Sequence, residues 1–416
     1  MMKKLLFIAV VTSLISLPTG CGKGDDIFKK SGAGKSEASF DATYTNQTVY
    51  FDSSDANKEV TSVDAEKNTY KFKNSSEKAK QIKKGDIILI DGKAFGKADK
   101  ITTQGSEIVV EVVEATLNEL IEDGTIEWST YCDFRPETNY SVQMGDQTFF
   151  PTKAGNEAKF DFSYGGYKYS IVLDLKKEYA NVKMEVTKNL AGSTVKGKFI
   201  VEGRISSFYS NNKIVYQKSK LKEFSNTNDN LQGELTLSIV VAGSGNDAIN
   251  LEMPVILGAY PLMVGPIPTV IKLKMQVVVN AVVPMDGSAQ VSAKFKYDSQ
   301  TGIIYDGLKT DVKGKIGNYS IDKKQTETGA SSAIAVNFGI GFPRIEVGIF
   351  NSVVVPWVQT AFLIGGDYTS FPACRQAKAQ FIGSCGIDFS FLGFTHKENK
   401  NIWQKEEVLF KTGDCR

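Results

Sequence analysis

The chain contains one histidine and five cysteines, and these two residue types limit the chemistry that it can perform. A metal centre with two histidine ligands is excluded, and a serine or cysteine nucleophile with a histidine base would need His396. His396 lies in the polar stretch 395–401 between two apolar runs, a setting typical of a solvated turn. We therefore assign no catalytic residue, no metal ligand and no cofactor from these residues.

The twenty residues before Cys21 indicate that its thiol could be modified. Met1–Lys4 is short and positive, and the apolar run Leu5–Leu17 falls short of the about 20 residues that a transmembrane helix needs. The small residues of Pro18–Gly20 come directly before the cysteine. This segment resembles the signal peptide and lipobox of bacterial lipoproteins. The resemblance implies cleavage before Cys21 and a lipid on its thiol, so that the partner is a membrane reached through acyl chains. The alternative is an ordinary signal peptide with a cysteine nearby.

The residues after Cys21 bear on location. Gly22 is similar to the residue found in lipoproteins that continue to the outer membrane, and Asp25–Asp26 is similar to signals for display on the cell surface. The following stretch 29–39 is rich in Gly, Ser and Lys, a composition that cannot bury enough surface to order itself. We expect residues 1–20 to be a signal peptide and residues 21–45 to be a flexible tether.

The other four cysteines form an even set, which favours disulfides in an oxidising compartment. Four cysteines allow three pairings, and we favour Cys374–Cys385 as a local clip with Cys132–Cys415 joining the two ends of a large domain. A zinc site is the alternative. Zinc sites commonly use close pairs such as C-x-x-C, which the chain lacks, so the sequence favours disulfides.

Two oxygen-rich segments are candidates for calcium. The first contains Asp52, Asp55, Asn57 and Glu59, and the second spans Asn226–Asn230. The first lacks the central glycine and the alternating spacing of a helix-loop-helix calcium site. We interpret both segments as solvated turns.

Glycan chemistry is the remaining possibility for a site. A glycosidase needs two carboxylates some 5–10 Å apart, but no pair stands out among 47 acidic residues. Aromatic side chains could stack on sugar rings, and the candidates are Tyr164, Tyr167, Tyr169 and Trp357. On β-sheets such aromatics more often form core or cross-strand pairs, which is the interpretation that we favour.

Short apolar or alternating runs bounded by turn residues predict a small β-barrel or roll over residues 46–130. The expected strands are Val60–Val63, Thr69–Phe72, Ile87–Ile90 and Ile108–Val113. A short helix is expected at Leu117–Asp123, because Thr116 and Glu119 form a capping-box pattern and Gly124 is placed to end the helix.

Residues 131–416 predict a large antiparallel β-sandwich or curled sheet, so that the whole chain is all-β. Apolar and polar residues alternate strictly at 198–205, 235–241 and 271–281, which indicates strands with one buried and one wet face. Further strands are expected at 291–297, 333–340, 353–364, 387–393 and 402–410. Asp286–Gly287 and Thr301–Gly302 are expected hairpin turns.

The segment Tyr260–Val270 contains three prolines, which predict an extended lead-in without ladder hydrogen bonds. It is similar to a Gly-Pro-x-Pro element of uncharacterised secreted β-proteins, and the resemblance bears on fold alone.

Charge excludes one class of partner. Removing residues 1–20 takes Lys3 and Lys4 from the 49 basic residues and none of the 47 acids, which leaves 47 of each sign. A neutral chain is not expected to bind nucleic acid, because phosphate binding needs an excess of positive charge.

We expect an anchored, non-enzymatic binding or adhesion protein whose ligand is a glycan or a protein. The alternatives are a glycan hydrolase with paired carboxylates and a carrier of an apolar ligand between the sheets.

Overall fold

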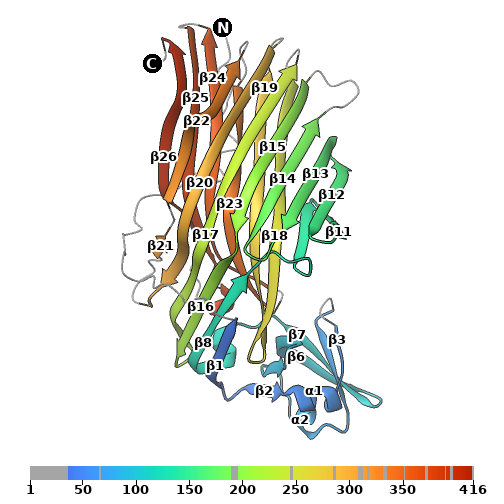
Figure 1. Cartoon of the computed structure of the whole chain (residues 1–416). Helices are drawn as coiled ribbons and strands as arrows, with labels where there is room; N and C mark the ends of the chain where they lie inside the picture. Colours follow the sequence, from blue (N-terminus) through green and yellow to red (C-terminus); the bar gives the residue numbers. More distant parts are fainter. Residues whose placement is uncertain are drawn as a thin grey trace, which may run out of the picture.

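The computed structural model describes residues 36–64, 67–188, 195–243, 247–283, 287–307, 313–315, 318–330, 335–350, 352–370, 373–388, 390–393 and 397–414. Two large sheets stand face to face in one elongated body, and a smaller sheet lies at one end of it (Figure 1). The predicted all-β class with large antiparallel sheets is confirmed. Cys21, His396, Cys415 and the predicted signal peptide lie outside the described residues. Among the described residues, none of the helices has the length and apolar character needed to cross a membrane.

The small module contains a six-stranded sheet and two short helices. In sheet order its strands are β2 (Thr48–Phe51), β5 (Ile87–Ile90), β6 (Ala94–Gln104), β7 (Glu107–Val113), β4 (Thr69–Lys73) and β3 (Val60–Asp64), and its helices are α1 (Ser53–Glu59) and α2 (Glu77–Lys80). Strand β2 runs parallel to β5, and the other neighbours are antiparallel. The module has its own apolar core, in which the rings of Phe51 and Phe72 stack with centroids 4.7 Å apart. The four strands predicted here from the sequence are all present.

The first large sheet has twelve strands. Along its main path they are β1 (Glu37–Tyr44), β8 (Ile121–Cys132), β16 (Phe208–Gln217), β17 (Lys220–Gly243), β15 (Val195–Ser206), β14 (Tyr179–Lys188), β13 (Tyr167–Leu175), β12 (Glu157–Tyr164) and β11 (Thr152–Ala154), with β20 (Gly287–Tyr305), β21 (Lys313–Lys315) and β22 (Asn318–Ala330) on the other side of β17. Strand β17 is long enough to pair with β16 through its first half and with β15 through its second half.

The second large sheet has eight strands. Their order is β10 (Gln147–Phe149), β9 (Asn139–Met144), β18 (Asp247–Val264), β19 (Ile267–Val283), β23 (Ala335–Ile349), β24 (Ser352–Ser370), β25 (Ala373–Asp388) and β26 (Lys397–Gly413). All neighbours are antiparallel.

The two large sheets share one core, formed by the inward residues of each alternating strand. Phe295 of the first sheet meets Phe362 and Phe381 of the second, with ring centroids 4.7 and 5.8 Å apart. All three side chains are buried. Aromatic rings fill this part of the interior, which is where a carrier of an apolar ligand would need a cavity.

Two expected boundaries differ from the structure. Residues 37–44 fall in the predicted tether but form β1, which pairs with β8. Strand β8 was expected in the small module and belongs to the twelve-stranded sheet instead. The predicted helix is present as α3 (Leu117–Leu120), with its capping box of Thr116 and Glu119. It ends before the predicted Asp123, because Ile121 already begins β8.

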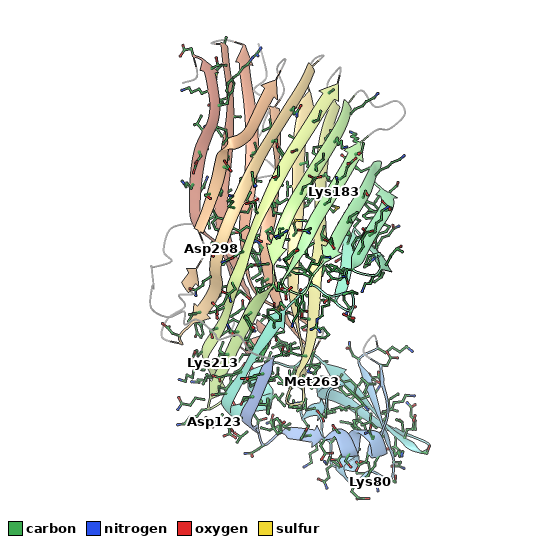
Figure 2. All side chains as sticks on the ribbon, in the orientation of Figure 1. Lys80, Asp123, Lys183, Lys213, Met263 and Asp298 are labelled. Atoms are coloured by element: carbon green, nitrogen blue, oxygen red, sulfur yellow. The ribbon has the colours of Figure 1, made fainter. Side chains whose placement is uncertain are left out.

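The proline-containing segment is a hairpin, so the predicted ladder-free lead-in is wrong. Strand β18 ends at Val264 and β19 begins at Ile267, and these two residues pair across a turn in which Gly265 has φ +58°. The tip of this hairpin contacts the small module, where the Gly92 N–H donates to the carbonyl of Pro266 over 3.0 Å. Met263 lies in this hairpin, at the end of the large sheets next to the small module (Figure 2). The prolines therefore shape a connection between the two parts of the molecule.

Two other local predictions are also wrong. Thr301–Gly302 does not form a turn, because both residues continue β20 and pair with β17. The expected strand 387–393 is instead the end of β25 followed by a 3₁₀ turn, η1 (Ser390–Leu392). At Thr301–Gly302, pairing with the distant strand β17 carries β20 through the predicted turn.

Candidate functional site

The cysteines do not form the predicted pairs. Cys132 and Cys385 are buried and keep their thiols, so neither Cys132–Cys415 nor Cys374–Cys385 is a disulfide. Cys374 is disulfide-bonded, but not to either of these two residues. Cys374 and Cys385 share one extended strand, β25. At about 3.3 Å per residue, eleven residues separate their Cα atoms by roughly 36 Å, far beyond the about 7 Å limit of a disulfide. Burial raises the pKa of the Cys132 thiol well above its usual value.

Both oxygen-rich segments belong to regular elements, helix α1 for the first and strand β17 for the second, so the solvated turn predicted for each is wrong. Asp52 is the N-cap of α1, and its carboxylate accepts from the Asp55 N–H over 2.8 Å. Asn226 and Asn228 lie in β17 and are buried, so the predicted solvated turn at this second segment is wrong. Across the described ranges, no three acidic, cysteine or histidine side chains gather as metal ligands would.

The predicted tyrosines lie at the contact between the two large sheets, whereas Trp357 pairs within the second sheet. Tyr169 stacks on Phe162 with centroids 4.7 Å apart, and Phe162 stacks on Phe149 of the other sheet at 4.0 Å. Tyr167 and Tyr169 are buried. Trp357 lies under the guanidinium of Arg344, 4.4 Å from its ring centroid. The core and cross-strand interpretation is therefore confirmed for the tyrosines, and a sugar could not reach the face of Tyr169.

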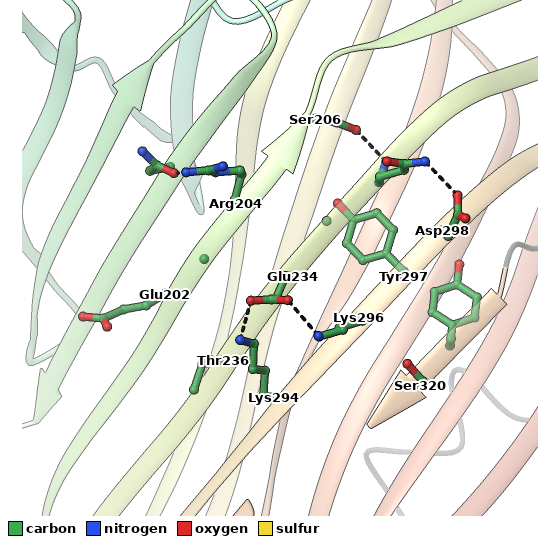
Figure 3. A pocket seen from close by; sticks show the side chains of 15 residues that line it. Glu202, Arg204, Ser206, Glu234, Thr236, Lys294, Lys296, Tyr297, Asp298 and Ser320 are labelled. Carbon is green, nitrogen blue, oxygen red and sulfur yellow. Dashed lines mark hydrogen bonds and ion pairs between the residues drawn. The ribbon is translucent and has the colours of Figure 1, made fainter. Parts of the chain in front are cut away.

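The candidate site is a hollow of about 910 Å³ on the outer face of the twelve-stranded sheet. Alternation places it there: Val201 and Ile205 of β15 point into the core, whereas Glu202 and Arg204 point outward. We call this the first hollow (Figure 3). It is lined by Asn181, Glu202, Gly203, Arg204, Ser206, Gln232, Gly233, Glu234, Thr236, Lys294, Lys296, Tyr297, Asp298, Tyr319 and Ser320.

The shape of the first hollow follows from local backbone features. The pairing of β17 with β20 shifts register between Asn228 and Leu231, and Asn230 has φ +64° in this bulge. Bulges increase the twist of a sheet. Beside the bulge, Gly203 allows very close packing, since a Cβ there would lie 1.9 Å from the carbonyl oxygen of Glu234. The sheet therefore curls where β15, β17 and β20 meet.

Side chains in the first hollow are held by cross-strand interactions. Lys183 pairs with Glu202 over 3.0 Å, and the Arg204 Nε donates to Asn181 over 3.1 Å. The Gln232 amide donates to Asp298 over 3.1 Å. The guanidinium of Arg204 also lies 4.1 Å from the ring centroid of Tyr179. These interactions fix donors and acceptors on the surface before any ligand arrives.

Glu234 is the centre of the charged part of the first hollow. It pairs with Lys294 and, over 3.3 Å, with Lys296 (Figure 3). The hydrogen bond from Lys294, followed by that from Lys296, lowers the pKa of Glu234 below its usual 4.5. A general acid in glycoside hydrolysis needs a raised pKa. Glu234 is therefore unsuited to that role, and the hollow offers binding groups rather than an acid–base pair built on it.

The sequence contained part of the signal for this site. The alternation predicted over 198–205 places Glu202 and Arg204 on the wet face of a strand. The sequence could not predict that Glu202 and Arg204 lie close to Gln232 and Lys294, because these residues belong to strands that are separated by long stretches of chain.

A domain of unknown function, DUF8403, matches residues 30–123. The match covers β1 and the small module, and it ends before the strands that form the first hollow. No curated protein and no solved structure matches the chain.

Proposed function

We propose that this chain is an exported, lipid-anchored protein that binds a glycan in the first hollow and does not transform it. The observation that carries the proposal is the charge-balanced, hydrogen-bonding surface of this hollow. Its acidic residues are Glu202, Glu234 and Asp298, and its basic residues are Arg204, Lys294 and Lys296. Equal numbers of the two signs favour a neutral ligand over a polyanion.

The position of the first hollow favours a glycan over a peptide. Peptides often bind sheets by adding a strand at an exposed edge, where backbone groups are unpaired. Here β17 is paired on both sides, with β15 and with β20. The backbone is therefore satisfied, and recognition must use the outward amide, hydroxyl and charged side chains. Sugar hydroxyls donate and accept in the same way.

A glycan array tests the proposal with the purified protein and three variants. We expect binding by the wild type, with affinity reduced about tenfold by Arg204→Ala or Lys296→Ala, because each removes a charged hydrogen-bond donor. Lys159→Ala is the matched control, since Lys159 forms an outer-face pair with Asp161 on β12, away from the first hollow. Loss of binding in the control as well as the test variants would contradict the assignment of the site. Release of shortened glycans during incubation would show an enzyme instead.

The anchor needs its own test. Cells expressing wild type or Cys21→Ala are labelled with radioactive palmitate, and the protein is isolated. We expect label in the wild type alone. Equal labelling of both proteins would show that Cys21 is not the lipidated residue.

A further inference from the structure

A second hollow of about 410 Å³ lies on the same outer face of the same sheet. It extends over β1, β8, β16 and β17. Its lining residues are Glu37, Ala38, Ser39, Glu127, Trp128, Ser129, Asn211, Asn212, Lys213, Ser225 and Thr227. The outward side chains among them are mostly hydroxyls and amides, as Ser129, Asn211 and Thr227 occupy one row across three neighbouring strands.

The two hollows are connected by polar and aromatic side chains. Tyr131 and Tyr209 face each other across β8 and β16, with ring centroids 4.9 Å apart, and both are half-buried. Tyr209 also lies opposite Asp229, which accepts a hydrogen bond of 3.0 Å from Asn211 in the second hollow. On the other side, the Ser206 hydroxyl of the first hollow donates to the carbonyl of Asn230 over 2.8 Å. No change of sheet or face separates the two sites.

The separation suits a chain rather than a single sugar. Thr227 of the second hollow and Glu234 of the first lie seven residues apart on β17. Because the bulge between Asn228 and Leu231 shortens this stretch, the distance is better counted on the paired strand β20, where their partners Gly302 and Lys296 lie six residues apart. At about 3.3 Å per residue this corresponds to roughly 20 Å along the sheet. Figure 2 shows Lys213, near the second hollow, and Asp298, beside the first, spaced along this sheet.

We infer that the ligand is a linear, uncharged glycan that lies along this face, occupies both hollows and stacks a sugar ring on the Tyr131–Tyr209 pair. This inference rests on the proposed function, because it extends the first hollow. Two hydrogen-bonding hollows with an aromatic surface between them match the alternation of hydroxyl edges and apolar ring faces along a sugar chain. Two independent small ligands would not need the tyrosine pair between the hollows.

Size-graded linear oligosaccharides test the inference. The probes are β-1,4-, β-1,3- and α-1,4-linked glucans from disaccharides to decasaccharides, with binding to the purified protein measured by calorimetry. For the linkage that binds, we expect affinity to rise with length until the chain spans both hollows. Equal affinity for the shortest and longest members of that series would overturn the inference and leave the proposed function intact. Failure of every length to bind, together with no binding on the array, would defeat both.

Variants of the tyrosine pair and of the second hollow test which residues cause the dependence of affinity on chain length. We expect Tyr209→Ser to lower affinity for the longest chain about tenfold, equivalent to about 1.4 kcal/mol, because it removes a stacking surface, and to lower disaccharide affinity by a smaller factor. Tyr209→Phe should restore long-chain binding, because the ring is kept. Thr227→Ala tests the second hollow without touching an aromatic contact and should also weaken the long chains more than the disaccharides. Wild-type affinity of Tyr209→Ser and Thr227→Ala for the longest chain would overturn the inference, and thermal unfolding confirms that each variant is folded.

Discussion

The two halves of β17 place polar side chains in opposite environments. In the first half, Asn226 and Asn228 point into the sandwich and are 4% and 0% exposed. In the second half, Glu234 points outward, and 43% of its side chain is exposed. The strand is continuous, so the difference depends on which face each residue occupies. A polar side chain on the outer face can exchange its partner for water, whereas one on the inner face cannot.

The inward polar residues form a group that we call the interior amide cluster. Its members are Trp128, Thr130, Ser210, Asn212, Asn226 and Asn228, and they occupy neighbouring positions on β8, β16 and β17. The Asn226 amide donates to Asn212 over 2.6 Å and to Ser210 over 3.2 Å, and the Asn228 amide donates to Asn226 over 3.0 Å. These bonds require one register, because a slip of one residue would turn the amides to the outer face.

Hydrogen bonding in the interior amide cluster is incomplete. Among the described residues, the Trp128 Nε1, the Thr130 hydroxyl and the Asn228 Oδ1 have no hydrogen-bond partner. Each such buried group costs about 1–3 kcal/mol. The cluster therefore adds little net stability, and its contribution is to specify how three strands pair. The outer face carries many more polar groups at little cost.

The largest expected effect comes from a charge in the interior amide cluster. Asn226→Asp should lower the free energy of unfolding at pH 7 by about 3–5 kcal/mol, because a buried carboxylate without a cation is poorly solvated. Burial raises the folded-state pKa of the new carboxyl above its unfolded value, so the loss should shrink as the pH falls through that folded pKa. Urea unfolding across this pH range measures it. Thr227→Asp is the control, because Thr227 is the neighbour of Asn226 that points to the outer face. If both variants lost the same free energy of unfolding, the two faces of the sheet would not differ in how they tolerate a charge.

Glu346 tests a buried charge that does have partners. It is 2% exposed, and it pairs with Lys274 over 2.6 Å and with Arg344 over 2.7 Å. Burial acts to raise its pKa, but the two cations outweigh burial and lower the pKa below its usual 4.5. We expect Glu346→Gln to cost about 3 kcal/mol, because the cations lose their partner.

The pH dependence of the Glu346 contribution has a definite sign. A lowered folded-state pKa gives stability that is present above the unfolded pKa of about 4.5 and is lost as the pH falls through the lower folded value. Urea unfolding of wild type and Glu346→Gln should therefore converge under strongly acidic conditions. A constant difference at all pH values would show that packing, rather than charge, accounts for the loss.

A smaller effect is expected from the glycine that shapes the first hollow. The Cβ of Gly203→Ala would lie 1.9 Å from the carbonyl oxygen of Glu234, which belongs to the backbone and must move. Overpacking of this kind costs about 1–3 kcal/mol. We expect reduced stability by thermal unfolding together with weaker glycan binding. Wild-type stability would show that the curl of the sheet does not depend on this close approach.

The smallest effect is expected for Glu234 itself. Glu234→Gln removes ion pairs with Lys294 and Lys296, but the side chains of Glu234 and Lys296 are 43% and 50% exposed and are well solvated without each other, and only Lys294, at 17%, is largely covered. We expect a loss below about 1 kcal/mol in urea unfolding. A loss as large as that of Asn226→Asp would break the comparison between the two halves of β17.

Patterns of period two predicted much of this fold. The alternation at 198–205 and at 271–281 gave β15 and β19, and the capping pattern of Thr116 and Glu119 gave α3. The sequence did not reveal the hairpin at Gly265, because proline usually argues against pairing within a strand. It placed Glu202 and Arg204 on the wet face of a strand, but it did not show the rest of the candidate site, because the other side chains come from strands that meet only in the folded sheet.

The sequence by itself determined the all-β class and which side chains of each strand share a face, because alternation is a local property of an extended chain. Only the tertiary structure decided which strands are neighbours and in which register. That choice depends on burying the apolar faces of two sheets at once, and it brings Glu234 to Lys294 and Asn226 to Asn212. It also explains the cysteines: Cys374 and Cys385 are close in sequence, but one long strand holds them apart.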